Sequence, residues 1–547
     1  MNLKTLFLNT FKYSPKKQHE FELTQTSNDL KITQQNDINV YKSIYENLEF
    51  MKTKYNTLIN SDIVIRNFTI TINNRNLNAF LIFIDGMVDG NSINSNILKP
   101  LLLKNSIHMN LEDNKNNSQI IKKINLDDFI YKKLIPQNSI STETDLTSVC
   151  KKINSGFSAL FVDKCTKAFC IETKDLKGRT DSEPKNETII RGSQEAFVEN
   201  LRTNTGLIRK AINNENLIIE NCNIGEITNT QIAICYLSNI TNDDLIAEVK
   251  YRLNNLKIDS LISSGQLEQL ITDKSAIYPE IIATERNDRT CNYILSGRVA
   301  ILVNGSPYAL IVPGIFTDFL TSPEDLNLNH NYGKFLRFIR LVAFIFSIFL
   351  PGLYIATTSY HQELIPSELL FAIANARQAI PFPIIFEILL MEISFELIRE
   401  AGLRVPSPFG QTIGIIGALV LGDAAVTANI VSPILIIVVA FTGLCNFAIP
   451  DFSLSFALRI FRFYYIILGY LAGFLGIGIG LFIHFSSLSV LTSFGIPYFT
   501  PYIPYGNINK NSNYSLKPMW KREFRSNFLN TKKPRTEEEI SMKWKEN

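Results

Sequence analysis

The chain has 547 residues, which is longer than one ordinary domain and predicts two or more folding units. Its seven cysteines contain no CxxC pair and its five histidines are dispersed, so the composition excludes a disulfide framework and a zinc-finger spacing. The net charge of +3 describes neither half, because no lysine occurs between Lys334 and Lys510 whereas the flanking parts are rich in lysine. This shift predicts a soluble half followed by a membrane half.

The start of the chain is polar, and we interpret residues 1–55 as a poorly ordered tether with room for one short helix. The first apolar run is too short for a signal peptide and is followed by no small-residue cleavage site. We therefore expect the N-terminal half to be cytoplasmic.

Alternating β-branched and aromatic residues then predict strands that are interspersed with helices. The expected strand pairs are 64–72 with 77–85 and 157–163 with 168–175, and a helix is expected over 193–212. Farther on, Asn304-Gly305 predicts the tight turn of a hairpin. These patterns predict an α/β soluble half with two subdomains, residues 56–150 and 151–330.

The pattern over residues 335–505 predicts an all-α polytopic membrane domain. Residues 506–547 form a basic tail, which we expect to be a solvated, poorly ordered end; attraction to anionic lipid is the alternative. Segments that approach or exceed the ~20 residues needed to cross a bilayer are 335–356, 414–431, 433–449 and 461–485. Segment 381–398 is shorter and amphipathic. Cationic residues flank both ends of the domain, which favours an even number of crossings with both ends inside. Four crossings result if 381–398 lies in the interface or re-enters the membrane from one side. Segment 489–505 is the alternative for a sixth, broken segment.

Ionisable residues in the apolar half are candidates for a pore or gate, because a lone charge in hydrocarbon is costly and usually faces a protein interior or a water path. Glu392, Glu396 and Arg399 lie on one face of a helix, and Glu387 lies roughly opposite. This stripe is interpreted as a pore or its vestibule, as the polar face of an interfacial helix, or as an internal salt-bridge network. The remaining candidates are Asp423, for pore exposure or buried packing, and the breaks at Pro351, Pro381 and Pro383.

In the soluble half, charged residues near predicted strand ends and helix starts are candidates for assembly or coupling. Arginines of this kind most often bind acidic groups across subdomains or subunits, and an anion site at a helix start is the alternative. The candidates are Arg66, Asp85, Arg191, Arg202 and Arg209. Arg66 and Asp85 are interpreted as a strand-edge pair or as contacts between subunits.

Five separated blocks resemble the A subunit of bacterial spore germinant receptors, the GerA family. The blocks are RGSQEAFVENLRTNTGLIR (191–209), TERNDR (284–289), GRVAILVNGSPYALIVP (297–313), PFPIIFEILLMEISFELIREAGLRVPSPFGQTIGIIGALVLGDAAV (381–426) and SFGIPY (493–498). The resemblance runs from about Asp62 to Tyr505. The chain departs from the family pattern at Asn287, where proline is expected, at Asn304, where aspartate is expected, and at Asp423, where glutamine is usual.

The resemblance implies a receptor in the inner membrane of a dormant spore, with a transporter-like B subunit that senses the nutrient and a lipoprotein C subunit. It also implies that A subunits form a homo-oligomer that conducts monovalent cations out of the spore. The chain carries no GxxxxGK, HExxH or GxSxG motif, so we expect no enzyme activity, no cofactor and no nucleic-acid partner. The alternative is a membrane-anchored sensory protein whose α/β domain binds a small ligand or anion near Arg191 and Arg202.

Overall fold

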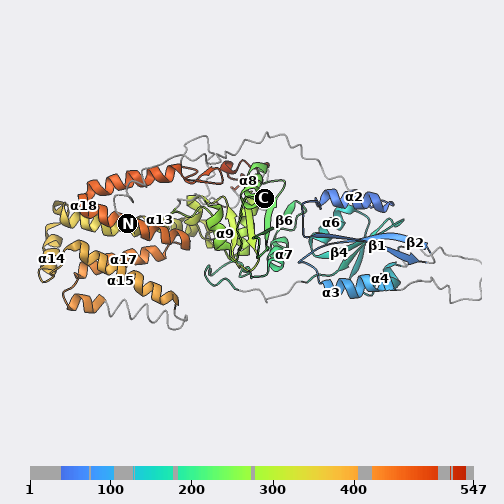
Figure 1. Cartoon of the computed structure of the whole chain (residues 1–547), viewed down its shortest axis with the longest axis horizontal. Coiled ribbons are helices and arrows are strands. Elements are labelled where there is room, and N and C mark those ends of the chain that lie inside the picture. Colours follow the sequence, from blue (N-terminus) through green and yellow to red (C-terminus); the bar gives the residue numbers. More distant parts are fainter. Residues whose placement is uncertain are drawn as a thin grey trace, which may run out of the picture.

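A computed structural model describes residues 38–72, 75–103, 127, 130–175, 183–272, 277–404, 422–502, 518 and 522–536. The molecule is elongated: a first sheet lies at one end, a second sheet lies in the middle and a helical half occupies the other end (Figure 1). The predicted order of a sheet-rich half followed by a helical half is confirmed.

The first sheet has five antiparallel strands in the order β1-β2-β4-β5-β3. Helices cover both of its faces, with α2 and α6 on one side and α3, η1, α4 and η2 on the other (Figure 1). The elements are α2 (Ile44–Lys54), β1 (Ile63–Ile72), β2 (Arg75–Ile84), α3 (Gly90–Ser92), η1 (Ile93–Leu98), α4 (Lys99–Leu103), η2 (Ile130–Leu134), β3 (Ile140–Glu143), α6 (Leu146–Asn154), β4 (Phe157–Val162) and β5 (Ala168–Glu172).

The first subdomain is larger than the sequence predicts at both of its ends. Strands β4 and β5 pair with β2 and β3, so the first sheet continues well past the expected border at residue 150. Alternating apolar residues define a strand but not its partner, which is why the border was misplaced. At the other end, α2 buries Met51 and Tyr55 against this sheet, so residues 38–55 belong to the fold and not to a tether. Residues 1–37 of the expected tether lie outside the described residues.

The second sheet also has five antiparallel strands, in the order β6-β7-β9-β10-β8. The expected turn at Gly305 is present, with the positive φ of +85° that favours glycine. The predicted helix over 193–212 begins only at Leu201, because the Asn200 side chain caps it by accepting from the backbone N–H of Thr203. The elements are α7 (Leu201–Ala211), β6 (Leu217–Ile224), β7 (Thr230–Leu237), α8 (Asp243–Asn254), α9 (Ser264–Ile271), β8 (Ile282–Thr284), α10 (Asn287–Leu295), β9 (Val299–Val303), β10 (Ala309–Val312), α11 (Phe316–Phe319) and α12 (Glu324–Asn327).

Among the described residues of the helical half, two helices are long and apolar enough to cross a membrane, α13 and α18. Helix α15 runs beside them within the bundle. The elements are α13 (His330–Ser359), η3 (Gln362–Leu364), α14 (Ser367–Arg377), α15 (Ile384–Arg404), α17 (Pro433–Phe447), α18 (Phe452–Val490), β11 (Thr492–Ser493) and β12 (Ile496–Pro497). Residues 414–421 of the predicted segment 414–431 lie outside the described residues, and residues 422–427 are helical.

Helix α18 is a hairpin of two antiparallel arms. Ala472 and Gly473 have non-helical backbone angles, and Gly473 has a φ of +59°. A Cβ on Gly480 would lie 3.2 Å from the Tyr464 ring, although 16 residues of straight helix would separate these positions by about 24 Å. The expected single segment 461–485 is therefore two arms that meet at a turn. The sequence signal, a long glycine-rich apolar run, fits either arrangement.

The chain returns to the second subdomain after α18. The Ser493 hydroxyl donates to the carbonyl of Glu280 (2.7 Å), and the backbone N–H of Phe316 donates to the carbonyl of Tyr498 (3.0 Å). These contacts place 491–502 against the sheet, so this stretch is not a further transmembrane segment. One apolar core runs without interruption from α7 and α10 through Tyr498 into both arms of α18.

The basic tail also folds back onto the second subdomain. Leu529 in η5 (Asn527–Leu529) is buried beside Ile315 and Ile496. Lys532 donates its backbone N–H to Ile240 and pairs with Asp243 (2.6 Å). We expected a solvated end, and residues 522–536 instead form a docked strap, because their few apolar side chains fill a recess beside Ile315. Residues 537–547 lie outside the described part of the chain.

Candidate functional site: buried charges in the helical half

Glu392 of α15 and Arg462 of α18 form a buried ion pair. Their side chains are 0% and 2% exposed, and Oε2 of Glu392 lies 2.7 Å from Nη1 of Arg462. Arg462 also donates from Nε to the carbonyl of Ser347 on α13 (2.9 Å). Removing one member of such a pair leaves an uncompensated charge in the interior. Of the three interpretations of this stripe, the internal network describes Glu392 in this chain.

A second set of ion pairs lies one helical turn along α15. Glu396 accepts from Nη1 of Arg459 (3.3 Å) and also pairs with Arg399. The Phe456 ring lies between the two guanidiniums, 3.9 Å from Cζ of Arg459 and 5.7 Å from Cζ of Arg399. With 24% of its side chain exposed, Glu396 stands at the edge of the buried network.

Glu387 lies in a separate polar contact at the other end of α15. Its side chain accepts from Nη2 of Arg377 (3.0 Å) and from the backbone N–H of Ser432 (3.2 Å). Glu387 is buried, so both carboxylate oxygens are held inside the bundle. This contact joins the end of α14 to the start of α17.

Asp423 differs from these carboxylates because it is exposed on the surface of the helical half. It lies in a short helical stretch, residues 422–427, and the Thr427 hydroxyl donates to its backbone carbonyl (2.8 Å). The side chain is therefore not buried in packing within this chain. An exposed carboxylate on an apolar bundle needs water or a partner.

The proline candidates occupy two different environments. Pro351 is buried within α13, which continues as one helix through Pro351-Gly352, so the expected break is absent there. Pro381 and Pro383 are exposed in the turn between α14 and α15.

Arg459 and Arg462 were not among the sequence candidates, although they neutralise two carboxylates that were. The signal was available: two arginines three residues apart enter a long apolar segment, where each needs a partner. His484 was missed as well. Its Nε2 lies 2.6 Å from the hydroxyl of Tyr278 and its Nδ1 lies 2.8 Å from the hydroxyl of Tyr465.

Two of the soluble candidates hold the subdomains together. Arg209 is 2% exposed and binds both carboxylate oxygens of Asp62 (2.7 and 2.9 Å) as well as Oδ1 of Asn60 (3.0 Å). Arg202 pairs with Asp85 at a more exposed position. The structure therefore brings these arginines to acidic groups across the subdomain border.

Arg66 and Arg191 are not part of this border. Arg66 is exposed on β1, opposite Leu81 of β2, and so does not form the considered pair with Asp85. Arg191 is exposed.

The junction of the two halves contains carboxyl groups with raised pKa values. Burial and, to a lesser extent, the charge of Asp451 raise the pKa of Glu268 to about 7. Burial raises the pKa of Asp451, which precedes α18, to about 6 despite the opposing charge of Arg289. Protonation at this junction is therefore favoured well above the usual range for carboxyl groups.

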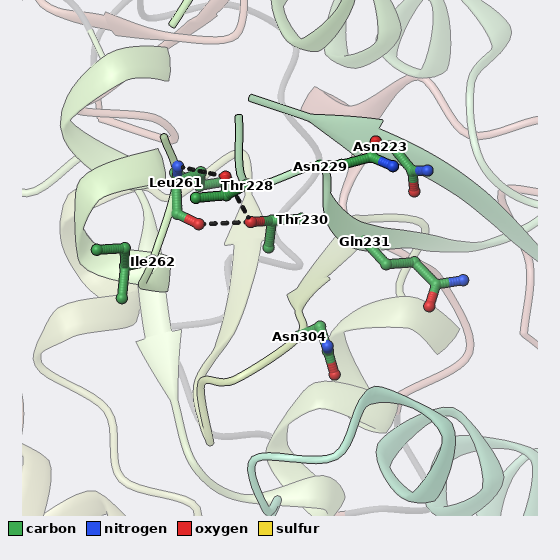
Figure 2. A pocket seen from close by; sticks show the side chains of 8 residues that line it. All are labelled: Asn223, Thr228, Asn229, Thr230, Gln231, Leu261, Ile262 and Asn304. Atoms are coloured by element: carbon green, nitrogen blue, oxygen red, sulfur yellow. Dashed lines mark hydrogen bonds between the residues drawn. The ribbon is translucent and has the colours of Figure 1, made fainter. Parts of the chain in front are cut away.

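Two of the cavities in the described part of the soluble half have polar linings. One, of about 480 Å³, lies between the subdomains and includes Arg202, Lys210, Asp89 and Asp175. The other, of about 640 Å³, is an open recess on the second subdomain. Figure 2 shows its neutral lining, with the hydroxyls of Thr228 and Thr230 bonded to the backbone of Leu261. The rest of its lining is Asn223, Asn229, Gln231, Ile262 and Asn304. Among the described residues no cluster of His, Cys, Asp and Glu could hold a metal ion.

The comparisons with known proteins agree on one family. Residues 49–528 match the family described as Bacillus/Clostridium GerA spore germination protein. Spore germination protein KA of Bacillus subtilis is 36% identical over 87% of this chain and 85% of its own. The uncharacterized membrane protein YfkQ of B. subtilis is 34% identical (84% and 86%), and spore germination protein GerLA of Bacillus cereus is 33% identical (81% and 86%).

A solved structure is also similar, the N-terminal domain of the A subunit of the Bacillus megaterium spore germinant receptor GerK3. It is 30% identical, covers 52% of this chain and 99% of its own, and has a TM-score of 0.38. The family match spans most of the chain, and the relatives are matched over most of their own lengths. The chain belongs to the GerA family of spore germination proteins.

Proposed function

We propose that this chain is the A-type membrane subunit of a nutrient germinant receptor, and that several copies assemble around a path for monovalent cations. The relatives are named as spore germination proteins, which supports the role in germination. We further propose a location in the spore inner membrane, with transporter-like B and lipoprotein C subunits as partners.

The contacts of the chain ends support a topology with both ends on one side. α13 leaves the second subdomain, and α18 returns to it as a hairpin. Residues 491–502 and the docked strap 522–536 lie against the same subdomain. An even number of crossings follows if the bundle spans the membrane, with the soluble half and the tail in the cytoplasm.

The observation that carries the cation path is the contrast between Asp423 and the other carboxylates. Glu387, Glu392 and Glu396 are neutralised by arginines of the same chain, whereas Asp423 is exposed on the bundle. Between subunits of an oligomer, a ring of such carboxylates attracts cations. We therefore propose that Asp423, and not the Glu392 stripe, faces the path.

Potassium release from spores tests this assignment. The strain carries this chain as its sole A-type subunit, germination is started with rich medium, and subunit levels are checked by immunoblot. Asp423→Asn should slow release several-fold at a normal level of the chain, and Asp423→Glu should retain it. Unchanged release in Asp423→Asn would remove Asp423 from the path.

The second candidate function is binding of a small ligand by the soluble half, and the cavity between the subdomains favours it. Its lining includes both cationic and anionic side chains, which suit a zwitterionic molecule. The full chain in detergent should then melt at a higher temperature with a free amino acid that it binds, because binding to the native state stabilises it. No shift with any of the common amino acids would argue against this function.

A further inference from the structure

We propose that three carboxylates of α15 and two arginines of α18 form a charge ladder with two positions, in which α15 slides by one turn and the ion pairs exchange partners. The ladder consists of Glu392, Glu396, Glu400, Arg459 and Arg462. The role of the ladder as a gate for ions rests on the proposed function. The movement of α15 does not depend on that function.

The spacing of the charges fits two positions. α15 and the first arm of α18 are antiparallel, since Glu392 pairs with Arg462 and Glu396 pairs with Arg459. The glutamates repeat every four residues, which is close to one helical turn of about 5.4 Å. A slide of that size toward α14 would pair Glu396 with Arg462 and Glu400 with Arg459. One-turn shifts of one element past another are an established form of switching.

The two directions of sliding differ in which charge loses its partner: toward α14 it is Glu392, which moves to the present position of Ile388, and toward the soluble half it is Arg462. A buried carboxylate can be neutralised by a proton, whereas an arginine stays charged. A slide toward the soluble half would place Ile388 opposite Arg462, and Ile388 is a fully buried apolar residue. The guanidinium would then be buried without a carboxylate, which is strongly unfavourable. The sequence thus favours the slide toward α14, which keeps both arginines paired.

The observed position leaves hydrogen-bonding capacity unused. Within the described part of the chain, Oε1 of Glu392 and Nη2 of Arg462 are buried without hydrogen-bond partners. Glu400 is 52% exposed and pairs with Arg404, which is 79% exposed, and such exposed pairs contribute little. Glu400 can therefore leave Arg404 at small cost and bind Arg459 after a slide.

The packing around α15 indicates that α13 and α18 are fixed to each other, whereas α15 is the helix that can move. A Cβ on Gly469 would lie 2.6 Å from the carbonyl oxygen of Gly352, so α13 and α18 are in backbone contact and cannot shift independently. α15 begins after the exposed turn that contains Pro381 and Pro383. If α14 moves with α15, the Arg377–Glu387 pair is kept, the bond from Ser432 to Glu387 is lost, and the Phe395 ring leaves its contact with Gly443 of α17.

Two variants should act in opposite directions. Glu400→Gln removes a carboxylate that pairs with an arginine of α18 only in the shifted position. It should therefore reduce potassium release in rich medium several-fold. Glu392→Gln removes the partner of Arg462 in the observed position and the unpaired carboxylate of the shifted position, so it should increase release without nutrient. Arg404→Gln is the matched control, since it breaks the same exposed pair as Glu400→Gln but leaves the ladder complete. Equal results for Glu400→Gln and Arg404→Gln would overturn the ladder.

A distance measurement tests the movement without relying on ion flow. Spin labels at Leu397 on α15 and Leu471 on α18, both exposed, report the slide in the full chain in detergent. Sliding toward α14 shortens their separation by about 5 Å. Glu392→Gln should enrich the shorter distance several-fold and Glu400→Gln should abolish it. The same single distance in all variants, Glu400→Gln included, would overturn the proposal even if Asp423 proves to line the cation path.

Discussion

Tyr278 of the soluble half and His484 of the helical half share a hydrogen bond of 2.6 Å across their junction. The His484 ring also stacks on Phe461, with 4.1 Å between ring centroids, and bonds to Tyr465. A single side chain of the second arm of α18 therefore contacts both the first arm and the soluble half. Movement of either half past the other must disturb this histidine.

Replacing Tyr278 by phenylalanine should destabilise the junction. The change removes the hydroxyl and leaves Nε2 of His484 buried without that partner, at a cost of about 1–3 kcal/mol. The melting temperature of the full chain in detergent should fall. Tyr332→Phe, at a residue that is 68% exposed, is the control and should leave it unchanged. Equal melting temperatures for both variants would show that the hydrogen bond does not stabilise the junction.

The Arg209–Asp62 pair should contribute far more to stability than the Arg202–Asp85 pair. Arg209→Ala leaves the Asp62 carboxylate buried and unpaired, which costs about 3–5 kcal/mol. The Arg202 side chain is 58% exposed, so Arg202→Ala should cost at most about 1 kcal/mol. Urea unfolding of the two variants measures the difference. Similar losses in both would contradict the assignment of the border to Arg209.

The junction should be more stable in mild acid than at neutral pH because of Glu268. Its folded pKa of about 7 lies above the ordinary value of 4.5, so the folded state binds the proton more tightly than the unfolded state. The contribution of Glu268 to stability therefore decreases as pH rises from about 4.5 to 7. Asp451, with a pKa of about 6, acts in the same direction. Glu268→Gln should flatten the decrease in melting temperature between pH 5 and pH 8. An identical pH profile in this variant would refute the assignment.

The docked strap should stabilise the chain through Leu529. Leu529→Ala opens a cavity beside Ile315 and Ile496 and should cost about 2–5 kcal/mol. Lys533→Ala removes an exposed cation of the same segment and is the control for charge. Limited proteolysis should cut the strap faster in Leu529→Ala only. If both variants resist cleavage like the unmodified chain, the strap is held by other contacts.

Local pattern predicts the elements of this chain better than it predicts their partners. The strands over 64–72 and 157–163 follow from alternation, but their membership in one sheet depends on pairing between Phe80 and Phe161, far apart in the chain. The same limit applies to the site. Spacing along α15 indicates that Glu392 and Glu396 share a face, but their partners lie 70 and 63 residues away. A glycine-rich apolar run likewise does not reveal that α18 reverses at Gly473.

α13 and the second arm of α18 are both anchored in the second subdomain, so this subdomain holds the first and the last helical segment of the bundle. A rotation of the subdomain would therefore move α13 and α18 together, while α15 is joined to them by its ion pairs and by apolar contacts in a cluster of Ile388 and Met391 with Ile355 and Ile466. The bundle thus consists of two helices that are fixed to the second subdomain, α13 and α18, and a third, α15, that is held to them by side-chain contacts. A rotation of the second subdomain would therefore reach the charges of α15 through α13 and α18.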